Sequence, residues 1–159
     1  MDEAGRKLLD TLEAQCSKRE YCSYDIREKL RRKLGDDADS ADEILSSLIA
    51  DHYVDDLRYA SAFAREKASL TGWGPIKIRF ALAAKRIPDA VISEALAEID
   101  AGKASDRLER LLEAKWKTLS DDPQGRLKLI KFGLGRGYGY DEVGRLVRQI
   151  SGKSEQDGI

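Results

Sequence analysis

The chain has 159 residues, 28 Lys and Arg against 29 Asp and Glu, and a formal net charge of −1. This length suits one ordinary domain or a short series of small modules and excludes a large enzyme fold. The 42% of hydrophobic residues argues against wholesale disorder. No run approaches the roughly 20 apolar residues of a membrane helix, so we expect a folded, soluble and cytoplasmic protein.

Three segments share one pattern: a helix with a basic end, a tight turn, and a second helix whose apolar residues recur at i and i+4. Ile44, Ile92 and Val143 are equivalent positions in the second helices, and their numbers indicate a repeat of about fifty residues. In the first helices, the equivalent apolar pairs are Ile26 with Leu30, Ile78 with Leu82, and Leu127 with Ile130.

A further amphipathic helix is expected before each of these pairs, over residues 8–18, 57–70 and 104–119. No strand is expected. The sequence therefore predicts an all-α fold of three tandem three-helix repeats, at residues 1–54, 55–101 and 102–150. Residues 151–159 contain few apolar side chains and two glycines, and we expect them to form a disordered tail.

Residue types that carry catalysis or hold metals are scarce. Cys16 and Cys22 lack a second pair, so they indicate neither a zinc site nor a disulfide framework. His52 is the single histidine, which leaves little scope for a metal site or for acid/base chemistry. The glycine-rich stretch 133–139 lacks the Gly-Lys-Ser/Thr ending of a phosphate loop, and we interpret it as a turn. We expect a binding module that is not an enzyme and has no cofactor or metal.

Charge is segregated along the chain despite the small net value. Residues 57–86 contain seven basic residues and one acidic residue, whereas residues 34–56 contain eight acidic residues and no Lys or Arg. A basic segment recurs in each repeat, and stacked repeats would present these segments on one surface suited to a phosphate backbone or an acidic protein groove. The residues predicted for this surface are Arg27, Lys29, Arg31, Arg32, Lys33, Arg58, Arg65, Lys77, Arg79, Lys85, Arg86, Lys128, Lys131 and Arg136.

A simpler interpretation of these cations is that Lys and Arg favour helix C-termini, where they complement the macrodipole. It accounts for residues 31–33 and 85–86, but not for Lys77 and Arg79 near a helix start. Two aromatic residues, Trp73 and Tyr138, lie on turns beside basic helices. They either contact a partner through their rings or are buried between helices, and the sequence leaves both possibilities open.

Several stretches resemble the RecX family of regulatory proteins. The central signature of that family is matched by Asp55 to Ala60, by Phe63 to Arg65 and by Gly72 to Ile78. Flanking similarity is found from Ser23 to Leu30 and from Lys131 to Val143. The order and spacing of these pieces cover most of residues 8–150.

The resemblance implies an elongated, curved array of three-helix repeats that modulates the RecA recombinase. Family members are expected to bind the groove of the RecA–DNA filament, limit its extension, and suppress ATP hydrolysis and strand exchange, in DNA repair, homologous recombination and the SOS response. The expected partner is the RecA filament on DNA, with weak direct binding to single- or double-stranded DNA, no membrane partner and a monomeric chain. The alternative is a helical-repeat nucleic-acid-binding protein that acts independently of RecA.

Overall fold

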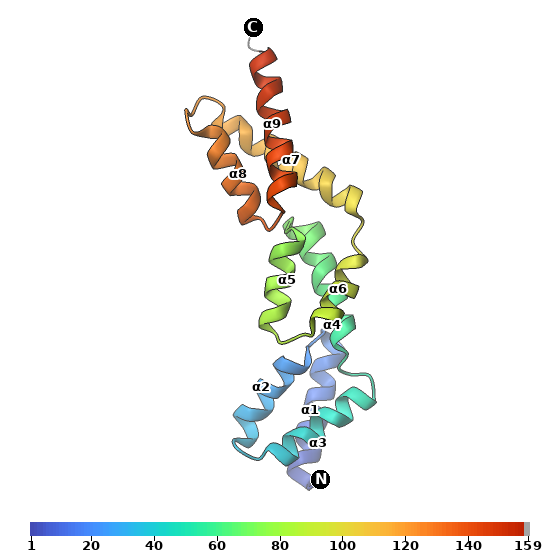
Figure 1. Ribbon diagram of the computed structural model, residues 1–159. Helices are drawn as coiled ribbons and strands as arrows, with labels where there is room; N and C mark the ends of the chain where they lie inside the picture. Colours follow the sequence, from blue (N-terminus) through green and yellow to red (C-terminus); the bar gives the residue numbers. More distant parts are fainter. Residues whose placement is uncertain (158–159) are drawn as a thin grey trace. The chain divides into compact units, whose positions relative to one another are not determined.

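The computed structural model describes residues 1–157, with side chains described through residue 153. This part of the chain forms nine α-helices and one π-helical turn, and it contains no strand (Figure 1). The predicted all-α repeat fold is confirmed. None of the helices within residues 1–157 combines the length and apolar character needed to cross a membrane. The elements are α1 (Glu3–Lys18), α2 (Ser23–Leu34), α3 (Ala38–Ala50), α4 (Asp56–Glu66), the π-helical turn (Lys67–Thr71), α5 (Pro75–Ala84), α6 (Asp89–Ala97), α7 (Ala101–Leu119), α8 (Gly125–Gly135) and α9 (Tyr140–Asp157).

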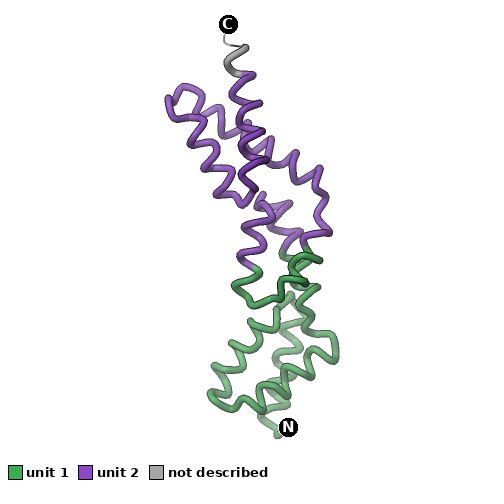
Figure 2. Tube along the Cα trace, viewed as in Figure 1, with its two compact units in different colours: residues 1–63, 82–95 green, residues 64–81, 96–159 purple. Residues whose placement is uncertain are grey.

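The chain divides into two compact units, shown in different colours in Figure 2. Unit 1 comprises Met1–Phe63 and Leu82–Ala95, and unit 2 comprises Ala64–Ala81 and Leu96–Ile159. Helices α4, α5 and α6 each contribute residues to both units. The two units are defined by contacts in space, whereas the predicted repeats are defined by the order of helices along the chain. The units therefore do not test the repeat boundaries at residues 54 and 101, which stay a prediction.

The core of unit 1 forms where α1 and α2 pack on α3. Ile26 and Leu30 of α2 are one helical turn apart, as are Ile44 and Leu48 of α3, so each pair faces the same neighbour. All four side chains are fully buried, and burial of each contributes about 1.5–3 kcal/mol. The pattern predicted for these two helices is therefore confirmed.

Helices α7, α8 and α9 pack on one another to form the main core of unit 2. Here the predicted apolar pair of α8 is right for Ile130, which packs against this core, but wrong for Leu127, which is 51% exposed. The buried row of α8 includes Leu129 and Gly133. A Cβ atom on Gly133 would lie 2.7 Å from Cγ1 of Val143, so the absence of a side chain lets α8 approach α9 closely. A pattern search for apolar side chains cannot detect a buried glycine.

The turns that follow α2, α5 and α8 each contain a residue with positive φ: Gly35 at 61°, Arg86 at 58° and Gly137 at 96°. These residues are spaced evenly along the chain, which supports the repeat. Glycine adopts this left-handed region readily, whereas an arginine there is strained. Arg86 therefore occupies a position that glycine fills in the other two turns.

Helix α9 continues past residue 150, where the sequence predicted that a disordered tail begins. Ile150 and Ser151 are buried, and the Ser151 hydroxyl donates a 2.7 Å hydrogen bond to the carbonyl of Val147. The helix runs to Asp157, and residues 158 and 159 of the predicted tail lie outside the described part. The back-bond satisfies the Ser151 hydroxyl, so this polar residue is buried in the helix at no cost of an unpaired group.

Candidate interaction surfaces

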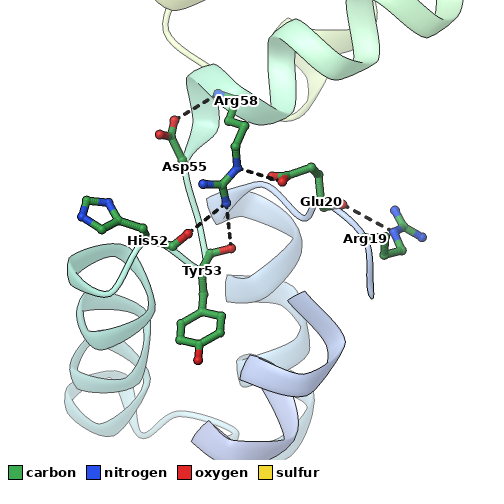
Figure 3. A network of polar contacts seen from close by, with 6 residues as sticks. All are labelled: Arg19, Glu20, His52, Tyr53, Asp55 and Arg58. Carbon is green, nitrogen blue, oxygen red and sulfur yellow. Dashed lines mark hydrogen bonds and ion pairs between the residues drawn. The ribbon is translucent and has the colours of Figure 1, made fainter. Parts of the chain in front are cut away.

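Arg58, one of the cations predicted to contact a partner, is engaged inside unit 1 (Figure 3). Its Nε donates to Glu20 Oε1 at 2.8 Å, and its Nη2 donates to the carbonyls of His52 and Tyr53 at 3.0 and 3.3 Å. The Arg58 backbone amide also donates to Asp55 Oδ1 at 3.0 Å. The guanidinium thus ties the segment that follows α1 to the segment between α3 and α4. Arg58 therefore has a structural role, and because its side chain is still 43% exposed, its role as a contact residue stays a prediction.

Lys85 forms the second internal contact of unit 1. Its Nζ lies 2.6 Å from Oδ1 of Asp25, which is only 15% exposed. Burial raises the pKa of Asp25, but hydrogen bonds from Lys85 and Cys22 and the Lys85 charge outweigh it, so the pKa is lowered. The same hydrogen bond raises the pKa of Lys85, with burial acting in the opposite direction. Lys85 is therefore both a structural residue and part of the surface described next.

Cations flank two tyrosine rings of unit 1. The Arg19 guanidinium and the Lys29 ammonium lie 4.3 and 4.9 Å from the centre of the Tyr21 ring. Lys85 and Arg86 lie 5.8 and 5.7 Å from the centre of the Tyr24 ring. These distances are within the range of cation–π attraction. We call this region the tyrosine groove; it has a volume of about 430 Å³ and is lined by Arg19, Tyr21, Tyr24, Asp25, Glu28, Lys29, Arg32, Tyr59 and Lys85.

The outer face of α2 supplies the remaining predicted cations of unit 1. Arg27 lies 3.4 Å from Asp42 and Arg31 lies 2.7 Å from Glu28, and both arginines are more than half exposed. Ion pairs this exposed contribute little to stability, so these arginines can exchange their partners at small cost. Arg32 and Lys33 are also exposed. Three predicted residues, Lys29, Arg32 and Lys85, thus line the tyrosine groove, and a fourth, Arg86, lies beside its Tyr24 ring.

In unit 2, Trp73 is half-buried and contacts two lysines. The ammonium groups of Lys67 and Lys77 lie 4.8 and 4.6 Å from its ring. Lys77 is also 3.5 Å from the carbonyl of Gly135. Tyr138, by contrast, is only 3% exposed, belongs to the core of unit 2, and donates a 3.2 Å hydrogen bond to the carbonyl of Gly72. The structure therefore excludes the predicted aromatic contact at Tyr138 and leaves the one at Trp73 as a prediction.

The other predicted cations of unit 2 are scattered. Arg65 pairs with Glu98 at 3.5 Å and Lys128 with Asp122 at 2.6 Å. Arg136 donates to the carbonyl of Thr71, which gives it an internal role. Lys131 is exposed and Arg79 is half-buried. Because Lys77 and Arg79 belong to a different unit from Lys85 and Arg86, a single basic surface along the chain stays a prediction.

Sequence reasoning missed the exposed apolar side chains, because it looked for cations. Ile76 and Phe80 are one turn apart on α5 and are largely exposed, with Phe80 at 78%. Ile78 on the same helix is fully buried. The sequence does contain an indication of these exposed side chains. Helix α5 is apolar on more than one face, so packing on one neighbour cannot bury all of its side chains.

Comparisons with known proteins are consistent with this architecture. Residues 55–96 match the family model described as RecX, second three-helix domain. Regulatory protein RecX of Vibrio parahaemolyticus is 30% identical over 128 residues, which are 80% of this chain and 81% of that protein. The chain belongs to the RecX family. Regulatory protein RecX of Bacillus mycoides is 30% identical over 145 residues, and that of Clostridium botulinum is 32% identical over 128 residues.

The coverage of these RecX proteins differs. The chain aligns over 86% of its own length with the Bacillus mycoides protein but spans only 53% of that relative, and it spans 59% of the Clostridium botulinum relative. Among solved structures, the crystal structure of RecX from Lactobacillus salivarius matches 92% of this chain and 96% of its own, with a TM-score of 0.82 and 22% identity. This likeness shows that the RecX fold is retained.

Proposed function

We propose that the chain is a non-catalytic regulator of the RecA recombinase. It binds the RecA filament on DNA and limits filament extension, ATP hydrolysis and strand exchange. Membership of the RecX family, whose relatives are named regulatory proteins, supports this proposal. The observation that carries it is the tyrosine groove, where Lys29, Arg32 and Arg86 offer cations to an acidic protein surface or to a phosphate backbone.

Arg86 is the strongest single argument for a binding role of this groove. It has a left-handed backbone where glycine fills the corresponding turns after α2 and α8. Such strain costs on the order of 1–3 kcal/mol and clusters at functional sites. The side chain is exposed and lies near the Tyr24 ring. A contact between the Arg86 guanidinium and the partner would explain why arginine, and not glycine, occupies this strained backbone position.

The test measures the DNA-dependent ATP hydrolysis of RecA while the chain is titrated in below one copy per RecA. We expect suppression at these ratios. The double variant Arg32→Glu/Arg86→Gly should inhibit at least about tenfold less well, because two charge-assisted contacts are lost. Arg86→Gly relieves backbone strain, so loss of inhibition cannot be assigned to unfolding.

A matched control reverses exposed cations that lie outside the predicted surface. Lys103→Glu/Lys117→Glu on α7 changes the net charge by more than the test variant does, and both lysines are exposed. This control should inhibit like the unaltered chain. Full inhibition by Arg32→Glu/Arg86→Gly would contradict the role of the groove, and absence of inhibition by the unaltered chain would contradict the proposed function itself.

A second candidate function, binding of nucleic acid without RecA, is favoured by the two tyrosine rings. Bases stack on aromatic rings, and neighbouring cations hold the phosphates. The test is fluorescence anisotropy of a labelled single-stranded oligonucleotide at several salt concentrations. Binding should weaken with a logarithmic slope of about 0.7 per phosphate contacted, and Tyr21→Leu should reduce it. Absence of binding at low salt would exclude this candidate.

A further inference from the structure

A second cleft lies within unit 2, between the π-helical turn and α7. It is lined by Ser69, Leu70, Thr71 and Gly72 on one side and by Arg107, Arg110, Leu111 and Ala114 of α7 on the other, and its volume is about 360 Å³. We call it the Leu70 cleft. It contains none of the residues of the tyrosine groove and none of the cations predicted from the sequence.

The backbone beside this cleft is irregular. After α4 the chain widens into the π-helical turn, which ends at Gly72 with φ of 72°, and the amide of Trp73 donates to the carbonyl of Lys67 at 2.9 Å. Single π-helical turns cost backbone regularity and are frequent at functional sites. Here the turn leaves Leu70 81% exposed, the largest exposure of any large apolar side chain within the described residues.

The α7 wall of the cleft supplies positive charge from Arg107 and Arg110. The Nε atom of Arg107 is buried and has no hydrogen-bond partner within the described part of the chain. Arg136 does not line the cleft but lies beside it: its Nε is likewise buried without a partner within the described residues, and its Nη2 would lie 3.2 Å from a Cβ atom on Gly72. Arg110 is exposed. A buried guanidinium donor without an acceptor is unfavourable, and none of the residues that line the cleft is acidic.

These features together match a ligand that carries both an apolar side chain and a carboxylate. Leu70 on one side of the cleft and Leu111 on the other offer apolar contacts, and Arg107 and Arg110 of α7 can share a carboxylate through N–H donors. We propose that the Leu70 cleft docks a short segment of another protein in which an Asp or Glu lies beside a large apolar side chain. A phosphate backbone would satisfy the arginines but leave the leucine exposed, whereas a protein anchor covers both.

This proposal goes beyond RecA regulation, and its test does not involve RecA. The full-length chain, labelled with ¹⁵N, is titrated with the peptide acetyl-Asp-Leu-Phe-Asp-amide while backbone amide and arginine Nε–H signals are followed by NMR. We expect saturable shifts at the amides of Leu70 and Arg110 and at the Nε–H signals of Arg107 and Arg136. The peptide acetyl-Asn-Leu-Phe-Asn-amide should bind about tenfold more weakly, because it lacks the carboxylates.

Two variants test the two walls separately. Leu70→Ser and Arg110→Ser replace exposed side chains, so the fold should persist, and the unchanged pattern of distant amide signals checks this. Each should weaken binding of the acidic peptide about tenfold. The matched controls Phe80→Ser and Lys117→Ser, which change an equally exposed ring and an exposed cation elsewhere in unit 2, should bind like the unaltered chain. Shifts centred on Ile76 and Phe80, equal binding of both peptides, or no saturable shift at millimolar peptide would overturn the proposal.

Discussion

Helix α2 of unit 1 and helix α8 of unit 2 occupy the same place in the repeat but are built differently. The inner face of α2 consists of large buried side chains, Ile26 and Leu30. The corresponding row of α8 is Leu129 followed by Gly133. The outer faces also differ: α2 exposes mainly charged side chains, including Arg27 and Arg31, whereas α8 exposes Leu127 and Leu134 around Lys131.

The difference shows that one helix order is stabilised in two ways. Unit 1 relies on side-chain volume at α2, whereas unit 2 relies on the close approach of backbones at α8. Close approach at a glycine leaves little space for any added atom. The two helices should therefore respond oppositely to changes in side-chain size, with α2 sensitive to removal and α8 sensitive to addition.

The largest effect is expected for Leu30→Ala in unit 1. Leu30 is fully buried between α2 and α3, so truncation should lower the free energy of unfolding of unit 1 by about 2–5 kcal/mol. Amide hydrogen exchange on α2 and α3 would measure the loss. In Leu127→Ala on α8 the altered side chain is largely exposed, so the free energy of unfolding that amide exchange reports for unit 2 should change by less than about 0.5 kcal/mol. Equal losses in the two variants would contradict the comparison.

A smaller loss, about 1–2 kcal/mol, is expected for Gly133→Ala. The new Cβ atom would lie 2.7 Å from Cγ1 of Val143 and 3.4 Å from Cδ2 of Leu112. Overpacking costs about 1–3 kcal/mol, and the better helix propensity of alanine recovers part of it. The control is Gly135→Ala, where no atom lies within 4 Å of the added Cβ, and this variant should stabilise the chain. Urea denaturation of the two variants gives their free energies of unfolding. A loss of equal size in Gly135→Ala would refute steric crowding at Gly133.

The fold was predictable to the extent that it depends on apolar periodicity. Helix order, the absence of strands within residues 1–157 and the buried pairs of α2, α3 and α5 all follow from side chains that recur each turn. The fully buried row of α8, Leu129 and Gly133, did not, because Gly133 marks a core position by lacking a side chain. The end of α9 was also missed, because Ser151 satisfies its hydroxyl within the helix.

An intermediate effect is expected for Arg58→Ala. The variant loses charge-assisted hydrogen bonds to Glu20 and to the carbonyls of His52 and Tyr53, and it should lower the stability of unit 1 by about 1–2 kcal/mol. Arg58→Lys retains the charge but cannot reproduce the forked donors. Both variants should therefore speed amide exchange at residues 52–58. Wild-type exchange in Arg58→Lys would show that charge alone holds this segment.

The candidate site was less predictable than the fold, because the sequence does not show which cations are available to a partner and which bond to groups of their own chain. Arg58 and Arg136 were predicted as contacts but bond to carbonyls in their own units. Leu70 and Arg110 were not predicted at all, because the cleft that unites them depends on a π-helical turn that no periodicity indicates. Exposure is decided by tertiary packing, not by residue type.

The ion pair between Lys85 and Asp25 should add a pH dependence of less than about 1 kcal/mol, because Lys85 is 40% exposed and solvent screens the pair. The pKa of Asp25 is lowered in the folded chain. Its contribution is therefore present at neutral pH and is lost as the pH falls through the folded pKa, below the usual value near 4. Urea denaturation between pH 7 and pH 2 should show a shallower acid loss in Asp25→Asn. An unchanged acid profile would contradict the role of the pair.

The smallest effect is expected for Phe80→Ser on the outer face of α5. The ring is 78% exposed, so its removal should change the free energy of unfolding by less than about 0.5 kcal/mol, as measured by urea denaturation. Ile78→Ala on the buried face of the same helix is the control and should cost about 2–5 kcal/mol. A loss above about 1.5 kcal/mol in Phe80→Ser would mean that the ring packs against the chain in solution. A negligible loss would show that α5, like α8 and unlike α2, has an apolar outer face that does not stabilise the fold.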